Sequence, residues 1–310
     1  MNWGVFSMND AQKRAIRRSF EAAAETYDEA AFLQQEIARR LDDHLEGMKI
    51  TPGVILDAGC GTGYGLSLLK ARFPEARLIG LDLARAMLVE ARKRQADAGN
   101  WRQRALALAR RRVPLAPLCA DMERLPLARN SVDMVWSSLA LQWVGAPDAA
   151  FKEAHRVLKP EGLYLFASFG PDTLMELRAA SVALDGHQHV NRFIDMHDLG
   201  DALVHAGFSN PVMEMERITL TYEALPALLR DLKAIGAHTV LENRRTGLMG
   251  KAEWRQLAAN YERFRRDGRL PASYEVVYGH AWAGAKDRLA DGRQIIQMKM
   301  ARRQGQGGAP

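Results

Sequence analysis

Three acidic residues lie at the ends of apolar runs in the first half of the chain, and a glycine-rich turn follows the first of them. Asp57 ends the run VILDA at 54–58, Asp82 ends the run RLIGLD at 77–82, and Asp121 follows the run near 116–120. The glycines after the first acid are Gly59, Gly61 and Gly63. Glycine permits positive φ and close approach of a ligand to the backbone. A small molecule with hydrogen-bond donors is therefore the ligand that this pattern predicts.

The glycine turn does not match the two best-known phosphate-binding loops. A dinucleotide fingerprint G-x-G-x-x-G starting at Gly59 would need glycine at position 64, where Tyr64 stands. The triphosphate motif G-x-x-x-x-G-K-[ST] does not occur in the sequence. A carboxylate at the end of the strand also repels a pyrophosphate and suits an ammonium group, so we expect a ligand without phosphate at this turn.

Short apolar runs alternate with amphipathic segments from residue 53 onward, which predicts an α/β fold of the Rossmann-like kind. The predicted strands are 54–58, 77–82, 116–120, 132–137 and 162–168. The predicted helices are 64–72, 84–96 and 147–158. Such a sheet is mostly parallel and twisted, with helices on both faces, and it binds ligands at the carboxyl ends of its strands.

The three acids then fall on successive strand ends at one edge of the sheet. Asp57 can accept from an amine, Asp82 from both ribose hydroxyls, and Asp121 from an adenine amino group. Amine, ribose and adenine without phosphate describe S-adenosylmethionine, which we expect as the cofactor. The alternative use of these acids is to cap the helices that follow the strands.

The remainder of the chain predicts additions to one α/β unit rather than a separate fold. We expect an N-terminal helical lid over 1–50, with residues 10–46 helical, and a core over 51–170 with an arginine-rich insertion near 97–115. Residues 171–284 should supply substrate-binding helices and edge strands of the same domain, and 285–310 a flexible basic tail. The helices expected there are 172–184, 196–206, 223–235 and 251–266, and the strands are 212–221 and 274–282.

Composition is that of an ordinary globular protein, with 47% hydrophobic and 26% charged residues among 310. No apolar stretch approaches a membrane span, and the N-terminus lacks a segment of signal-peptide length, so we expect a cytoplasmic protein. The net charge of +6 suits an acidic partner. The histidines at 189, 197, 238 and 280 lack metal-ligand spacing, and we expect no metal site.

Over residues 53–169 the chain resembles the class I S-adenosylmethionine-dependent methyltransferases, and over 14–282 it resembles the malonyl-acyl-carrier-protein O-methyltransferase family of biotin synthesis. The blocks that carry the second resemblance are FEAAAETYDEAAFLQ (20–34), SSLALQW (137–143), HVNRF (189–193), DLKAIGA (231–237) and LPASYEVVYG (270–279). Members of that family methylate the free carboxylate of malonyl carried on acyl-carrier protein. The resulting ester primes pimeloyl synthesis.

A second family shares part of this pattern. FGPDTLMELRAA (169–180), HVNRF and DLGDALVHAGF (198–208) are also similar to a complex I assembly factor that hydroxylates an arginine. That alternative implies a hydroxylase, or an assembly factor that only binds the cofactor. The blocks at 231–237 and 270–279 favour the O-methyltransferase.

The resemblance implies a set of site residues on both sides of the transferred methyl group. The expected cofactor contacts are Asp57, Gly59, Gly61, Gly63, Asp82, Leu83, Asp121, Met122 and Ser137. For the acceptor carboxylate we expect Arg192 first and Lys233 second, with a structural ion pair as the alternative for each. Tyr27 is expected to close over the cofactor, or else to serve only in packing.

A carboxylate acceptor simplifies the chemistry, because it is already ionised at pH 7 and needs no general base. The expected partner is acidic malonyl-acyl-carrier protein, guided by Arg14, Arg17 and Arg18 or by Arg244 and Arg245. We expect a monomer that binds neither nucleic acid nor membrane.

Overall fold

The computed structural model describes residues 9–97, 115–182, 184, 190–235 and 250–284. Nearly all of the expected insertion near 97–115 and the whole expected tail 285–310 lie outside the described residues, as do Arg244 and Arg245.

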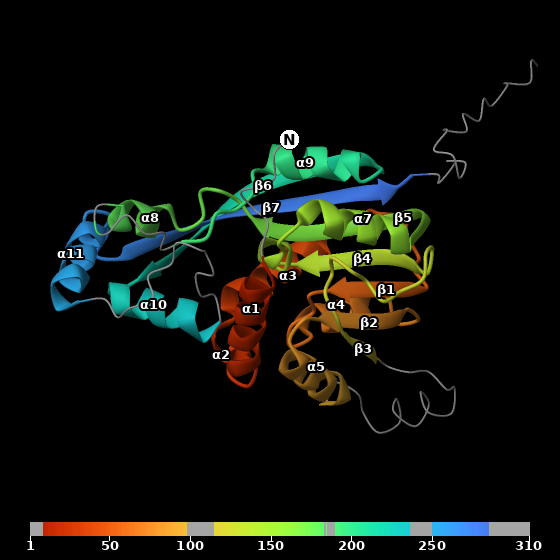
Figure 1. Ribbon diagram of the computed structural model, residues 1–310, viewed down its shortest axis with the longest axis horizontal. Coiled ribbons are helices and arrows are strands. Elements are labelled where there is room, and N and C mark those ends of the chain that lie inside the picture. The colour runs from red at the N-terminus through yellow and green to blue at the C-terminus, as the bar shows by residue number, and fades with distance from the viewer. Residues whose placement is uncertain (1–8, 98–114, 183, 185–189, 236–249, 285–310) are drawn as a thin grey trace, which may run out of the picture.

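The centre of the molecule is one seven-stranded sheet with the strand order β3-β2-β1-β4-β5-β7-β6 (Figure 1). Its strands are β1 (Val54–Ala58), β2 (Arg77–Asp82), β3 (Leu115–Cys119), β4 (Val132–Ser138), β5 (Leu158–Phe169), β6 (Phe208–Tyr222) and β7 (Leu270–Ala283). The first five strands pair in parallel, whereas β7 is antiparallel to both β5 and β6. The chain reverses its direction of travel across the sheet between β1 and β4, the position where open α/β sheets bind ligands.

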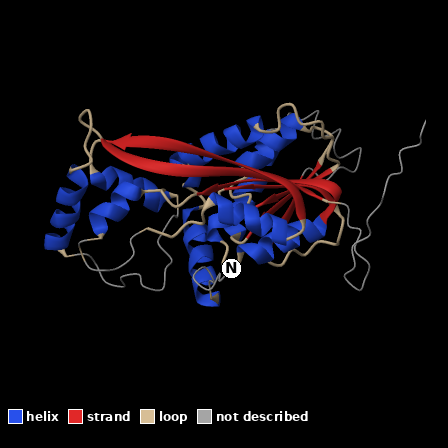
Figure 2. Ribbon diagram, turned by 90° about the horizontal axis from the view of Figure 1, so that it is seen from above, coloured by secondary structure: helices blue, strands red, loops and turns tan. Residues whose placement is uncertain are grey.

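Helices cover both faces of the sheet (Figure 2), which confirms the predicted Rossmann-like architecture. Those that follow the parallel strands or flank them are α3 (Phe32–Asp43), α4 (Tyr64–Arg72), α5 (Arg85–Asp97), α7 (Pro147–Val157) and α9 (Met196–His205). Alternate residues of a strand point to opposite faces. Ile55 therefore packs with α3 and α4, whereas Leu56 packs with α7 and α9.

The N-terminal region was predicted as helical over 10–46, and it consists of three helices. They are α1 (Asp10–Ala23), α2 (Tyr27–Ala30) and α3. A capping box between Asn9 and Gln12 starts α1. Ile16 of α1 faces a cavity at the sheet edge, whereas Ile37 of α3 packs in the core. A continuous helix could not serve both directions, and the short breaks let each helix bury its own apolar face.

The C-terminal region extends the same sheet through a long antiparallel pair. β6 and β7 pair from Phe208 opposite Ala283 to Tyr222 opposite Leu270, so both strands are longer than the predicted 212–221 and 274–282. Around the far end of this pair lie α8 (Met175–Ser181), α10 (Leu225–Ala234) and α11 (Lys251–Glu262) (Figure 1). None of the helices in the described ranges is long and apolar enough to cross a bilayer.

Candidate functional site

The turn after β1 needs glycine for two different reasons. All three predicted glycines have positive φ: 84° at Gly59, 52° at Gly61 and 83° at Gly63. A Cβ on Gly59 would lie 2.1 Å from the Cβ of Ala140, and one on Gly63 would lie 2.9 Å from the Cβ of Ala91. Gly59 thus lets the turn approach the loop after β4, and Gly63 lets α4 pack on α5. Around Gly61 nothing lies within 4 Å of an added Cβ, so its surface is open.

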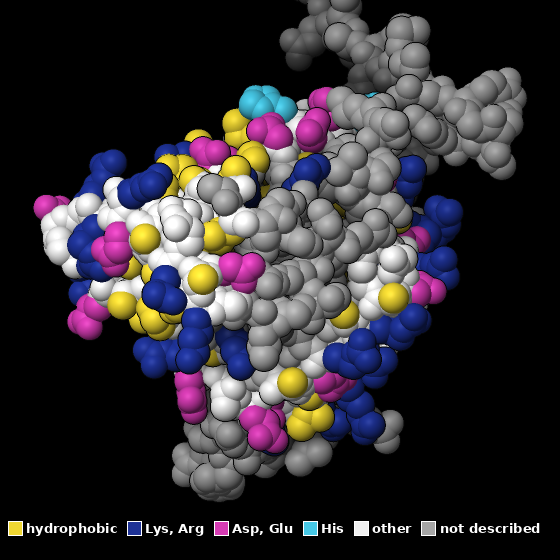
Figure 3. All heavy atoms as spheres, turned by 60° about the vertical axis from the view of Figure 1, so that its left-hand side comes forward, with side chains coloured by type: hydrophobic (Ala, Val, Ile, Leu, Met, Phe, Trp, Pro, Cys, Tyr) yellow, Lys and Arg dark blue, Asp and Glu magenta, His cyan; other side chains and the backbone are white. Residues whose placement is uncertain are grey.

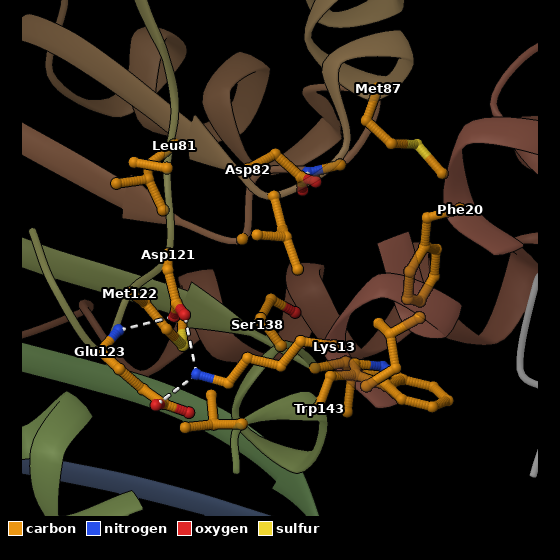
Figure 4. Close-up of a pocket in the computed structure, with 18 of the residues that line it drawn as sticks. Lys13, Phe20, Leu81, Asp82, Met87, Asp121, Met122, Glu123, Ser138 and Trp143 are labelled. Carbon is orange, nitrogen blue, oxygen red and sulfur yellow. Dashed lines mark hydrogen bonds and ion pairs between the residues drawn. The ribbon is translucent and has the colours of Figure 1, made fainter. Parts of the chain in front are cut away.

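Two adjoining cavities lie at the carboxyl edge of the parallel strands, beneath the N-terminal helices. The first, which we call the β2–β3 cavity, is lined by Asp82, Leu83, Asp121 and Met122 of the sheet edge and by Lys13, Ile16 and Phe20 of α1 (Figure 4). The second, which we call the α3 cavity, is lined by Gln34, Gln35, Ala38, Asp57, Trp136, Tyr64 and Gly65. Both cavities share Tyr27, Gly59, Gly61, Ser138 and Leu139.

The structure brings most of the residues predicted to contact the cofactor to these two cavities, and two of those residues lie elsewhere. Gly63 lines neither cavity, because it serves the contact between α4 and α5. Ser137 is fully buried and donates its hydroxyl to the carbonyl oxygen of Ala58 at 2.8 Å. Its neighbour Ser138, the last residue of β4, lines both cavities instead. To predict which of two neighbouring serines faces the cavities, one must know where the strand ends and which sheet face each residue points to. The sequence pattern did not determine either.

Asp82 organises the glycine turn while it faces the β2–β3 cavity. Its carboxylate accepts from the backbone N–H of Gly61 at 2.9 Å and of Ala84 at 2.8 Å. Burial raises the pKa of Asp82 to about 6, and the backbone donors offset part of that rise. The group is therefore mostly ionised at pH 7 and available to further donors such as hydroxyl groups.

Asp57 is the most strongly buried acid of the site, at 2% exposure. Burial raises the pKa of its carboxyl well above the usual range, and the nearby charge of Asp82 raises the pKa further. Within the described part of the chain, no Lys or Arg pairs with Asp57 or with Asp82. A cationic ligand group in the α3 cavity would supply the missing positive charge.

Asp121 already holds a partner that the sequence analysis did not identify. The Lys13 ammonium donates to Asp121 at 2.8 Å and also to Glu123 (Figure 4). The other carboxylate oxygen of Glu123 accepts from Gly145 N at 2.7 Å. These two acceptors raise the pKa of Lys13 and outweigh the opposing effect of its burial. Lys13 lies on the same helix face as Ile16 and Phe20, at spacings of three and seven. That spacing was the signal available in the sequence.

Further polar contacts hold the N-terminal helices against the glycine turn and α5, over the two cavities. Glu21 accepts from the backbone N–H of Arg85 at 2.8 Å and so caps the start of α5. Thr62 in the glycine turn donates to Asp28 at 2.6 Å, and Arg94 also binds that carboxylate. Tyr27, which directly precedes Asp28, lines both cavities. Burial is the largest cause that raises the pKa of Tyr27, so its hydroxyl stays protonated.

The two cations predicted for an acceptor lie outside both cavities. Arg192 precedes α9 and is exposed, and Lys233 near the end of α10 is also exposed. Arg192 makes contacts within the folded chain. The structure therefore does not bring either predicted cation to the cavities that hold the three acids.

Comparison with known proteins connects this arrangement to methyl transfer. Residues 56–166 match the family model described as a methyltransferase domain. A relative from Laribacter hongkongensis, named malonyl-acyl-carrier-protein O-methyltransferase, is 55% identical over 92% of this chain and 95% of its own length. A relative of the same name from Gallionella capsiferriformans is 52% identical over 92% of this chain and 96% of its own length.

Solved structures agree with the fold. A candidate methyltransferase from Bacillus halodurans superposes with a TM-score of 0.56 at 17% identity, covering 81% of this chain and 100% of that one. The YcgJ protein from Bacillus subtilis superposes with a TM-score of 0.53 at 12% identity, covering 81% and 99%. At such low identities these likenesses support the architecture alone.

Proposed function

This chain belongs to the malonyl-acyl-carrier-protein O-methyltransferase family, and on that premise we propose that it methylates the free carboxylate of malonyl carried on acyl-carrier protein. The observation that carries the proposal is the order of acids along the two adjoining cavities: Asp57, then Asp82, then Asp121. That order supports binding of the cofactor, and the names of the relatives favour methyl transfer over the arginine hydroxylation that the sequence left open.

The residues present fit S-adenosylmethionine as the cofactor. Asp57 would take its ammonium group, Asp82 its ribose hydroxyls and Asp121 its adenine amino group, while Leu83 and Met122 would contact the adenosine. Asp57 and Asp82 lack a positively charged partner among the described residues, as acceptors reserved for a ligand should. The bound cofactor supplies an electrophilic methyl group on a positively charged sulfur.

The chain's own contribution is alignment and the exclusion of water. The acceptor carboxylate is already an ionised nucleophile, so no residue has to remove a proton from it. Tyr27, Ser138 and Leu139 lie where the two cavities adjoin, the position that the reacting groups would share. Because burial keeps the Tyr27 hydroxyl protonated, it can donate a hydrogen bond there without competing as a nucleophile. Holding two groups in line can lower a barrier by about 7–11 kcal/mol.

Arg192 and Lys233 remain our proposed partners for the malonyl carboxylate. Both side chains are exposed, so the malonyl arm would have to bury one of them on binding. A guanidinium binds a carboxylate through two parallel hydrogen bonds, which favours Arg192.

An acidic carrier protein fits the positive net charge of the chain. Lys and Arg side chains recur across the face formed by the C-terminal helices, with acidic side chains between them (Figure 3). Arg14, Arg17 and Arg18 are exposed on α1, close to the cavities that this helix covers. We propose α1 as the side where the carrier approaches a cytoplasmic, monomeric enzyme.

The test is transfer of a labelled methyl group. The protein is incubated with malonyl-acyl-carrier protein and methyl-labelled S-adenosylmethionine, and acetyl-acyl-carrier protein is the control that lacks the free carboxylate. We expect label on the malonyl carrier alone, in an ester that mild alkali removes. Absence of that label from a protein that binds the cofactor would overturn the proposed acceptor.

A further inference from the structure

The loop between β4 and α7, residues 139–146, borders the position where the two cavities adjoin. Leu139, Ala140, Trp143 and Val144 of this loop line the β2–β3 cavity, and Leu139 also lines the α3 cavity. Phe20 of α1 packs edge to face on Trp143, with ring centroids 5.3 Å apart (Figure 4). A shift of this β4–α7 loop would therefore change the space that the proposed cofactor and acceptor share.

Leu139 has a backbone conformation that its own residue type does not favour. Its φ is 51°, in the left-handed region that a leucine rarely adopts, and its side chain is buried. Such a conformation persists only where the surrounding structure holds it. The Leu139 N–H donates to Ala167 O at 2.9 Å, which fixes the start of the loop. Residues 144–146 belong to neither a helix nor a strand, so the far end of the loop depends on other contacts.

Glu123, in the loop after β3, anchors that far end. One carboxylate oxygen of Glu123 accepts from Gly145 N at 2.7 Å and from Ala146 N at 3.1 Å. The other oxygen binds the Lys13 ammonium of α1 (Figure 4). The Glu123 side chain is 13% exposed, so these bonds are largely shielded from water, which strengthens them. A single carboxylate thus joins the loops after β3 and β4 to the helix that covers the β2–β3 cavity.

We propose that Glu123 is a positioning residue for methyl transfer, which keeps Leu139 and the rest of the β4–α7 loop in place beside the acceptor carboxylate. Both of its oxygens have partners in the folded chain, so Glu123 acts through the loop and through Lys13. The inference rests on the proposed function, in which alignment is the chain's main contribution. A misplacement of about 1 Å at the reacting groups can lower a rate by about a hundredfold.

The test measures a single turnover, in which protein saturated with S-adenosylmethionine is mixed with malonyl-acyl-carrier protein. Glu123→Gln keeps the shape of the side chain and one acceptor oxygen but loses the charge, whereas Glu123→Leu loses both acceptors. We expect the rate constant of methyl transfer to fall about tenfold in Glu123→Gln and about a hundredfold in Glu123→Leu. Affinity for S-adenosylhomocysteine should stay within about fivefold of the wild type, because the lost ion pair with Lys13 is partly exposed. An affinity in that range also shows that the variants are folded.

Glu153 of α7 offers a matched control. Its carboxylate accepts from Leu125 N at 2.7 Å and binds Arg156 at 2.7 Å, so it also joins a backbone N–H to a cation. Glu153 lines neither cavity, and Glu153→Gln should therefore transfer the methyl group at the wild-type rate.

A wild-type rate constant in both Glu123 variants would overturn the inference, since the loop would then keep its position without this carboxylate. An equal loss of rate in Glu153→Gln would also overturn it, as would a loss of cofactor affinity as large as the loss of rate, because either result would make the role of Glu123 merely structural. If the wild type transfers no methyl group to the carrier, the proposed function fails and the inference fails with it.

Discussion

A carboxylate lies at each end of the parallel strands, and each accepts two backbone hydrogen bonds. Their pKa values are nevertheless shifted in opposite directions. At the carboxyl end, Asp82 accepts from two backbone N–H groups of neighbouring loops, and its pKa is raised to about 6, chiefly by burial. At the amino end, Asp133 accepts from Gly53 N at 3.0 Å and Val54 N at 2.8 Å, yet its pKa is lowered. Burial is the largest cause of the raised pKa of Asp82, whereas at Asp133 the opposing effect of burial is outweighed by Lys159, which binds it at 2.7 Å, and by the two backbone donors.

This contrast separates a structural acid from one that is reserved for a ligand. Asp133 has its complete set of partners in the folded chain, so its charge stabilises the start of β1. Asp82 has the same backbone contacts, and the described residues provide it with no cation. A half-buried acid with a raised pKa and no cationic partner is typical of functional sites.

The largest expected effect comes from substituting each of the two acids in turn and comparing the variants. Asp82→Ala should weaken S-adenosylhomocysteine binding by about 10²–10⁴-fold, because two charge-assisted hydrogen bonds of about 1.5–3 kcal/mol each are lost. Asp133→Ala removes a carboxylate with equivalent backbone contacts and should leave that affinity unchanged. Calorimetry on both variants measures the difference, and equal losses would show that the two acids have the same structural role.

A second prediction extends the comparison to the acceptor. Arg192→Ala should lower kcat/KM for malonyl-acyl-carrier protein by roughly a hundredfold and leave S-adenosylhomocysteine binding unchanged, because its proposed partner is the malonyl carboxylate. Lysine at this position should restore only part of the activity. Arg263→Ala, which removes another exposed arginine, is the control for lost surface charge. Wild-type kcat/KM in Arg192→Ala would exclude the role and leave Lys233 as the residue to test.

A third prediction concerns pH. Ribose hydroxyls donate to the ionised form of Asp82, so cofactor affinity must fall as pH decreases through the raised pKa of about 6. Between pH 7 and pH 5 the affinity for S-adenosylhomocysteine should fall about tenfold from this group alone. Asp82→Asn should remove this group's share of the dependence in calorimetric titrations, and any remaining dependence belongs to Asp57, whose pKa is also raised. A wild-type affinity that is constant over this range would mean that Asp82 is not the hydroxyl acceptor.

The smallest expected effect comes from the contact between α1 and the sheet edge. Lys13→Met removes the ion pairs with Asp121 and Glu123 and keeps an apolar side chain against Ile16 and Phe20. Partly exposed ion pairs contribute up to about 1 kcal/mol, so cofactor affinity should change by no more than about fivefold. Raising the salt concentration should reduce the difference between variant and wild type, and a loss of a hundredfold would mean that Lys13 itself contacts the ligand.

Many of the residues that line the two cavities could be predicted, because their positions depend on local sequence. Asp57 and Asp82 end parallel strands, and such ends meet at one edge in any sheet of this kind. Lys13 and Gln34 were not predicted, since their orientation depends on how α1 and α3 pack on segments far away in the chain. The interpretation of 10–46 as helical missed the breaks for the same reason.

The C-terminal half was harder to predict. Its strands and helices followed from local patterns, but the position of an exposed side chain such as Arg192, just before α9, depends on how α9 packs on β6. The sequence could therefore propose a chemical role for Arg192 without placing it against a cavity.

The most direct test of the account is a crystal structure of the protein with S-adenosylhomocysteine. The account predicts one ligand across both cavities, with its ribose on Asp82, its adenine beside Asp121, and its amino-acid end against Asp57. The sulfur should then lie where the cavities adjoin, next to Tyr27 and Ser138. A ligand bound in the reverse direction, or one that leaves the α3 cavity empty, would contradict it.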